Sequence, residues 1–217
     1  MPAQRFPDPL QARGDIVAVG DDLDVDTLIE AYGKGIFPWP MEELQLPWFS
    51  PRRRAILHFE EIHLSRSLQR AVRQNTFLFT VDRAFREVMK GCAETPRPGQ
   101  DGTWILPEIL EAYGLLHDRG VAHSVEVWEA EALVGGIYGV DCGGAFTGES
   151  MFYRRPNASK LALLHLVDHL RSQGLDWLDI QVMTPHMSAL GAREIARREF
   201  LVKLKTAQSA GKALVWS

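Results

Sequence analysis

The feature that most constrains the fold is a run of strand-like segments in the second half of the chain. Three such segments follow one another with only turn residues between them: SVEVWE (124–129), ALVGGIYGV (132–140) and GGAFTGESMF (143–152). Consecutive strands joined by short turns are typical of an antiparallel arrangement. The sequence therefore predicts an antiparallel meander over residues 124–152.

A helix and a further strand are expected after the meander. Residues 158–174 have a helical apolar pattern, with Asn157 as the expected N-cap and Gly174 at the end, and residues 175–182 form an apolar strand-like run. A helix that returns to a strand suggests that this strand lies beside the meander, which gives a mixed α+β fold. This order of elements resembles N-acyltransferases of the acetyltransferase type. The pyrophosphate-binding pattern of their coenzyme A users, Arg/Gln-x-x-Gly-x-Gly/Ala, does not occur in the sequence, so coenzyme A is not the expected donor.

The first half of the chain has a different pattern. Short helices alternate with strands there: helices at 24–35, 65–74 and 82–93, strands at 55–59 and 77–81, and a helix at 106–120 before the meander. The segment RPGQDG (97–102) is the best candidate boundary because Pro and Gly interrupt regular structure. We therefore predict a small N-terminal α/β domain over residues 1–96 and an acetyltransferase-like catalytic domain over residues 97–217.

Composition limits the partners and the compartment. A net charge of −4 argues against broad nonspecific binding of nucleic acid. Arg66, Arg70 and Arg73 nevertheless share one face of an expected helix, where they form either a phosphate-binding stripe or a solvated surface. The first twenty residues lack the apolar core of a signal peptide, and no segment reaches the ~20 apolar residues of a membrane span. We expect a cytoplasmic protein in which Cys92 and Cys142, which form no CxxC pair, are buried reduced thiols.

Two carboxylates and an amide are the candidate chemical groups. Asp179 and Gln181 are two residues apart on an expected strand, so both lie on one face and Ile180 on the other. Glutamine has no useful basicity, which favours a positioning role for Gln181 over general-base catalysis. Glu149 ends a glycine-rich strand-like segment. From these residues alone, a water-exposed strand end for Asp179 and Gln181 and a structural role for Glu149 are favoured.

Eight short blocks are distributed over residues 31–181 in a fixed order: YGKGIFPW, WFSPRRRAIL, GTWI, AHSVEVW, LVGGIYGV, FTGESMF, NASKLAL and DIQ. Together they resemble the leucyl/phenylalanyl-tRNA–protein transferase family. The resemblance implies transfer of Leu, Phe or Met from aminoacyl-tRNA to acceptor proteins that begin with Arg or Lys, which marks them for N-end-rule degradation. The acceptor's α-amine attacks the ester carbonyl of the donor, and no metal or other cofactor is required.

The resemblance also implies roles for individual residues. Asp179 and Gln181 form the catalytic element, in which Asp179 organises Gln181 or the incoming amine, and Glu149 holds cationic groups of the substrates. The pocket for the aminoacyl side chain is implied to contain Ile137, Phe146, Met151 and Leu163, which as sequence alone are equally core residues. The tRNA contacts are implied to be Trp39 and Trp104 at the terminal adenosine, and Arg66, Arg70 and Arg73 at the acceptor stem.

Several alternatives are weaker or remain open. His165 and His169 have the spacing of zinc-protease ligands but lack the intervening Glu, so we expect no metal site. The segment around Ser150, GESMF (148–152), lacks the second glycine of a hydrolase nucleophile elbow. Ser188 is displaced by one position from the family pattern, which leaves pocket detail open. The rival functions are a related tRNA-dependent transferase with another donor and a non-catalytic module that binds tRNA ends. We expect a monomer.

Overall fold

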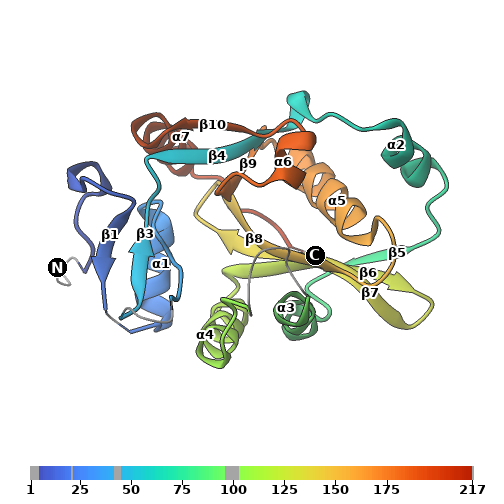
Figure 1. The fold of residues 1–217 in the computed structure, drawn as a ribbon, viewed down its shortest axis with the longest axis horizontal. Helices are drawn as coiled ribbons and strands as arrows, with labels where there is room; N and C mark the ends of the chain where they lie inside the picture. Colours follow the sequence, from blue (N-terminus) through green and yellow to red (C-terminus); the bar gives the residue numbers. More distant parts are fainter. Residues whose placement is uncertain (1–4, 21, 42–44, 96–102, 217) are drawn as a thin grey trace.

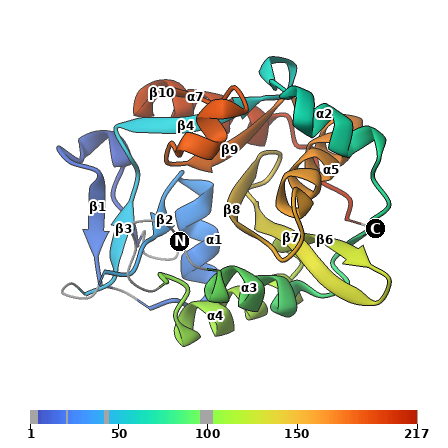
Figure 2. The same cartoon turned by 45° about the vertical axis from the view of Figure 1, so that its right-hand side comes forward.

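The computed structural model describes residues 5–20, 22–41, 45–95 and 103–216. Within these residues the strands form a three-stranded sheet and a seven-stranded sheet (Figure 1). The small sheet is antiparallel and has the order β1 (Ile16–Val19), β3 (Pro47–Phe49), β2 (Phe37–Pro38). Helix α1 (Val25–Gly33) lies between this sheet and α4 (Pro107–Asp118), as Figure 2 shows.

The large sheet contains the predicted meander. Its strand order is β10 (Arg193–Ala196), β4 (Arg53–His58), β9 (Trp177–Gln181), β8 (Phe146–Tyr153), β7 (Ala132–Asp141), β6 (Ala122–Glu129), β5 (Leu78–Val81). Neighbouring strands are antiparallel except β8 and β9, which are parallel. The meander β6–β7–β8 and the strand beside it are both confirmed, and so is the α+β class.

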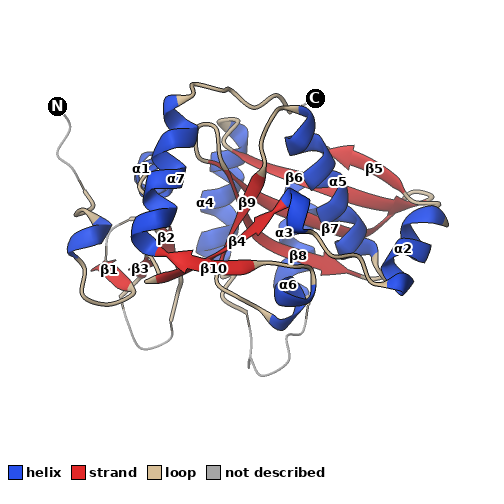
Figure 3. Cartoon of the chain, turned by 90° about the horizontal axis from the view of Figure 1, so that it is seen from above, coloured by secondary structure: helices blue, strands red, loops and turns tan. Residues whose placement is uncertain are grey.

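Helices cover both faces of the large sheet. Helix α5 (Ala158–Ser172) packs on one face of the meander, and α3 (Phe85–Glu94) and α4 pack on the other (Figure 1). Because both faces are covered, β7 is buried along most of its length. Helix α7 (Arg197–Ser209) packs against β4 and β10 (Figure 3). The remaining helical segments are α2 (Arg66–Arg73), α6 (Pro185–Ala189) and the 3-10 turns η1 (Pro9–Gln11) and η2 (Phe59–Glu61).

The two ends of α5 differ from each other in how well the sequence predicts them. Gly174 follows the helix with a positive φ of 83°, and its N–H donates to the Arg171 carbonyl at 2.9 Å, as expected for a glycine C-terminal signal. Asn157 occupies the N-cap position but has a φ of 68°, and its side chain makes no capping hydrogen bond. The expectation that Asn157 caps the helix is therefore correct in position and wrong in mechanism.

The expected domain boundary between residues 96 and 97 lies outside the described residues. Strands β4 and β5 precede it in sequence, and both are hydrogen-bonded members of the large sheet. A division at that point would separate paired strands of one sheet. Within the part of the chain that the structure describes, none of the helices has the length and apolar character needed to cross a membrane.

Candidate active site

The site lies where β8 and β9 separate. These parallel strands pair at a single position, Thr147 with Asp179. Residues beyond that pair on both strands, including Glu149 and Gln181, line a cavity of about 1000 Å³. A parallel pair that opens after one contact exposes polar strand ends inside an apolar cleft, which is a suitable place for polar side chains to meet a substrate.

Asp179 is held by a full set of donors. Its carboxylate accepts hydrogen bonds from Arg54 Nε at 2.8 Å and Nη2 at 2.6 Å, from Thr147 Oγ1 at 2.9 Å and from the Gln181 N–H at 3.0 Å. An ionised carboxylate offers about four acceptor positions, so these four donors saturate it. Asp179 and Arg54 are 2% and 1% exposed. We infer that Asp179 is an organising ion-pair partner and has no lone pair left to accept a substrate proton.

Arg54 is enclosed by the core. Its guanidinium lies 4.7 Å from the centroid of the Phe37 ring and 4.5 Å from that of Phe200. Its Nη1 also donates to the Gly35 carbonyl at 3.3 Å. The aromatic faces attract the cation and exclude water from the ion pair with Asp179. The charge of Arg54 is therefore buried beside the site.

Gln181 has an unusual backbone conformation at the end of β9. Its φ is 63°, in the left-handed region, and the pairing with β4 shifts there so that Ile180 is the extra residue of a bulge. This conformation costs a residue with a Cβ roughly 1–2 kcal/mol. The hydrogen bond from the Gln181 N–H to Asp179 fixes it. The bulge turns both side chains toward β8, where Asp179 meets Thr147 and Gln181 meets Glu149.

Glu149 connects the amide of Gln181 to two tyrosines. Its Oε1 accepts from Gln181 Nε2 at 2.6 Å and from the Tyr32 hydroxyl at 2.7 Å, and that hydroxyl also contacts the hydroxyl of Tyr113. Glu149 is half-buried and lines the cavity. Burial raises the pKa of Glu149 to about 8, although the hydrogen bond from Tyr32 favours the charged form. An adjacent cation would stabilise the carboxylate.

Comparison with protein families identifies the chain. The model for "Leucyl/phenylalanyl-tRNA protein transferase" matches residues 56–205, and the model for its N-terminal domain matches residues 21–52. The chain belongs to the leucyl/phenylalanyl-tRNA–protein transferase family. It is therefore an aminoacyltransferase that moves an aminoacyl group from tRNA to a protein acceptor. The resemblance seen in the sequence is confirmed.

Relatives with the same name cover nearly the whole chain. The leucyl/phenylalanyl-tRNA–protein transferase of Anaeromyxobacter sp. (strain Fw109-5) is 51% identical over 92% of this chain and 85% of its own length. That of Dechloromonas aromatica (strain RCB) is 47% identical over 100% of this chain and 94% of its own. Among solved structures, the ribosomal-protein-alanine N-acetyltransferase of Brucella melitensis biovar Abortus 2308 is 16% identical over 52% of this chain and 85% of that chain, with a TM-score of 0.35. L-PGS of Bacillus licheniformis is 16% identical over 76% of this chain and 57% of that chain, with a TM-score of 0.41.

Most residues predicted for the site of this transferase surround one cavity. The walls contain Glu149 and Gln181 together with Trp39, Trp104, Ile137, Met151 and Leu163. Phe146 is different because it is 1% exposed, does not line the cavity, and packs with its ring centroid 4.9 Å from that of Trp216. Phe146 supports the wall from behind. The helix expected for the arginine stripe is confirmed as α2, and it exposes Arg66, Arg70 and Arg73.

Sequence reasoning missed Arg54, Tyr32 and Thr147. A signal for Arg54 exists, because the strand-like run that follows it predicts burial, and a buried arginine needs a carboxylate partner. The apolar run 175–182 contains two carboxylates, Asp176 and Asp179, of which Asp179 lies inside β9. Tyr32 ends a helical segment with no local indication that its hydroxyl reaches Glu149. Such contacts depend on how distant elements pack, which periodicity does not encode.

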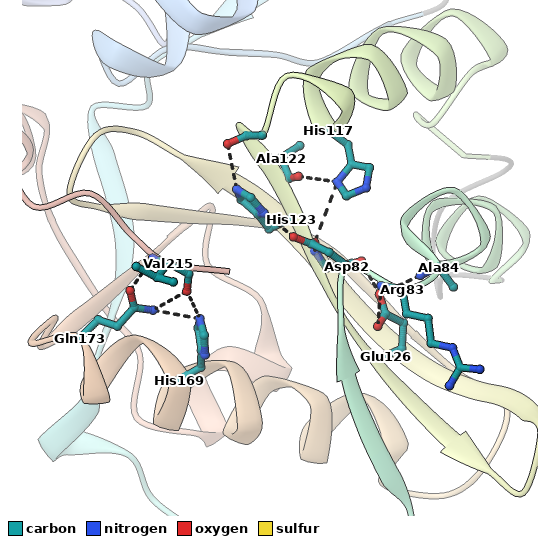
Figure 4. Close-up of polar contacts among 12 residues, drawn as sticks. Asp82, Arg83, Ala84, His117, Ala122, His123, Glu126, His169, Gln173 and Val215 are labelled. Carbon is teal, nitrogen blue, oxygen red and sulfur yellow. Dashed lines mark hydrogen bonds and ion pairs between the residues drawn. The ribbon is translucent and has the colours of Figure 1, made fainter. Parts of the chain in front are cut away.

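The histidine pair discounted as a metal site has other partners. The His165 ring stacks on Phe79 with centroids 4.7 Å apart. His169 Nε2 lies 2.9 Å from the Val215 carbonyl (Figure 4). The Gln173 side chain donates to the same carbonyl and accepts a hydrogen bond from the Val215 N–H. These contacts fasten the C-terminal segment to α5.

A second group among the described residues has metal-ligand spacing. Candidate ligand atoms of Asp82, His117 and His123 lie within 4.8 Å of one another. His123 Nδ1 is 2.6 Å from Asp82 Oδ2 and its Nε2 is 3.1 Å from the Gly120 carbonyl, while His117 Nδ1 is 2.8 Å from the Ala122 carbonyl (Figure 4). These nitrogens face hydrogen-bond acceptors, so the group forms a hydrogen-bonded network.

As predicted, both cysteines are buried free thiols.

Proposed function

We propose that this transferase uses leucyl-, phenylalanyl- or methionyl-tRNA as donor and an N-terminal Arg or Lys as acceptor, and so marks proteins for N-end-rule degradation. One observation carries the proposal: the hydrogen-bonded series Arg54, Asp179, Gln181, Glu149 and Tyr32 reaches an apolar cavity at Gln181 and Glu149. We further propose that the enzyme is monomeric. Its substrates are tRNA and newly exposed protein termini, which supports a cytoplasmic location.

The donor's aminoacyl end fits the apolar wall of the cavity. Ile137, Met151 and Leu163 line it and provide no charge. An uncharged side chain such as that of Leu or Phe enters such a wall favourably, whereas a charged side chain loses its hydration without compensation. Trp39 and Trp104 line the same cavity, and we assign them to the terminal adenine because a base stacks on an indole face.

Gln181 is the proposed positioning group for the acceptor amine. The Gln181 amide nitrogen donates to Glu149 Oε1 at 2.6 Å. The amide oxygen is then available to accept a hydrogen bond from the amine. Asp179 fixes the backbone of Gln181 and thereby the direction of this oxygen. Holding the amine against the ester carbonyl lowers the entropic part of the activation barrier.

Glu149 is the proposed partner of the acceptor's cationic groups. Among the described residues that line the cavity, it is the only carboxylate. The α-ammonium loses one proton before its nitrogen attacks the ester carbon, and the nitrogen loses a second proton as the amide forms. The ribose oxygen gains a proton when the ester C–O bond breaks. The Glu149 pKa of about 8 is close to the ~8 of an α-amine, so proton exchange between the two is nearly balanced.

The tRNA body is proposed to contact α2. Arg66, Arg70 and Arg73 are exposed on this helix and do not line the cavity. A stripe of guanidinium groups outside the reaction cavity is suited to the acceptor-stem phosphates, because phosphate contacts position a nucleic acid without reading its sequence.

A transfer assay tests the proposed function. The protein is incubated with radiolabelled leucyl-tRNA and a peptide that begins with Arg, and a matched peptide with an acetylated N-terminus is the control. We expect label in the free peptide alone. A protein that binds leucyl-tRNA but labels neither peptide would support the tRNA-binding module instead. Labelling with another aminoacyl donor but not with leucyl-tRNA would support the related transferase.

A further inference from the structure

The cavity contains a cation that none of the proposed roles uses. Lys160, in the first turn of α5, is half-buried in the cavity wall. No hydrogen bond or ion pair links it to another residue in the described part of the chain. A half-buried ammonium without a carboxylate partner is poorly compensated for its lost hydration. Among the described lining residues, Lys160 is also the only lysine or arginine.

His186 lies close to Lys160 and has a free nitrogen. His186 lines the cavity from α6, and its Nε2 is buried without a hydrogen-bond partner among the described residues. Burial lowers the pKa of His186, and the charge of Lys160 lowers it further. The imidazole is therefore neutral at physiological pH. An ammonium and an unsatisfied imidazole nitrogen together form a binding site for an anion with several oxygens.

The two substrates differ in charge at the end that enters the cavity. The acceptor brings an ammonium and a basic side chain, which Lys160 repels and Glu149 attracts. The donor brings phosphates. Leu163, one helical turn after Lys160, lines the aminoacyl part of the cavity. An ammonium one turn from the aminoacyl pocket lies within reach of the phosphate nearest the ester.

We propose that Lys160 and His186 bind the phosphate on the 5′ side of the donor's terminal adenosine. This inference rests on the proposed function, because it assumes that the aminoacyl-tRNA end occupies this cavity. Lys160 contributes the charge and His186 Nε2 contributes a hydrogen bond. The Asn157 side chain does not cap α5, so the positive end of the helix adds to the attraction. The contact fixes the adenosine and thereby the ester carbonyl in front of Gln181.

The test uses a non-transferable donor analogue with and without one phosphate. The probes are 3′-leucylamino-3′-deoxyadenosine and its 5′-monophosphate, whose amide link replaces the ester. Their dissociation constants are measured by calorimetry with the full chain. We expect the wild type to bind the phosphorylated probe at least tenfold more tightly. Lys160→Gln should reduce this ratio at least tenfold, and Lys160→Arg should restore most of it because guanidinium also binds phosphate.

The matched control is Lys205→Gln on α7, which removes the same charge from an exposed position. It should leave the ratio unchanged. Equal binding of both probes by the wild type, or an unchanged ratio in Lys160→Gln, would overturn the inference. The transfer assay with leucyl-tRNA is independent of this ratio. Normal transfer without phosphate preference rejects only the phosphate-binding site, whereas phosphate preference without transfer rejects only the proposed function.

Discussion

Asp179→Asn is predicted to destabilise the protein as well as slow the reaction. The carboxylate accepts four hydrogen bonds, two of them from the buried guanidinium of Arg54. An asparagine amide would point its NH₂ group at some of these donors and leave the Arg54 charge without a counter-ion. Breaking a buried ion pair by removing one partner costs about 3–5 kcal/mol. We expect a loss of this size in the free energy of unfolding.

The assay is urea-induced unfolding at pH 7, followed by circular dichroism. The control is Glu129→Gln, which breaks a 2.7 Å ion pair with Arg155 in which the side chains are 47% and 56% exposed. That change should cost less than about 1 kcal/mol because exposed pairs contribute little. Replacing both buried partners, Arg54→Met with Asp179→Leu, should cost less than Asp179→Asn alone. A loss below about 1 kcal/mol in Asp179→Asn would refute the saturated ion pair.

Three further predictions concern the cavity and its approaches. The Glu149 pKa is about 8 in the folded protein and 4.5 ordinarily, so the folded state binds an extra proton between these values and its stability falls as pH rises through this window. Glu149→Gln should reduce this dependence of the unfolding free energy on pH, measured from pH 4 to 9. An unchanged pH dependence in the variant would contradict the raised pKa. Met151→Ala should shift donor preference from Leu toward bulkier side chains by about 1–3 kcal/mol in competition assays, and an unchanged ranking would remove Met151 from the pocket. Replacing Arg66, Arg70 and Arg73 by Ala should raise KM for leucyl-tRNA and weaken its salt dependence but spare leucyl-adenosine, and equal losses with both donors would contradict the stripe.

The periodicity of neighbouring residues was sufficient to predict several helices and strands. The meander, α5 and β9 follow from alternating and helical periodicity and from the turn residues between them. Membership of β4 and β5 in the same sheet does not follow, because strand partners distant in sequence are chosen by packing. For the same reason, the change at residue 97 in the sequence pattern marks no break in the sheet.

The site was predictable in its residues more than in its geometry. The DIQ block and Glu149 were identified, and the structure brings them within hydrogen-bonding distance. Strand alternation alone does not predict the bulge at Ile180 or the positive φ of Gln181, where the Gln181 N–H bonds the Asp179 side chain instead of continuing the regular strand pattern. Phe146 was placed in the pocket by the family resemblance, but its side chain is buried in the core.

The most direct test of the account is the single-turnover rate of Gln181→Met. Methionine has a similar length and no oxygen with which to accept a hydrogen bond from the amine. With leucyl-tRNA prebound at saturation and an Arg-starting peptide added, the rate of peptide-bond formation should fall at least about tenfold, or roughly 1.4 kcal/mol in the transition state. The dissociation constant for leucyl-tRNA should stay near that of the wild type. A folded Gln181→Met variant that forms the bond within about twofold of the wild-type rate would show that the Gln181 amide does not position the amine.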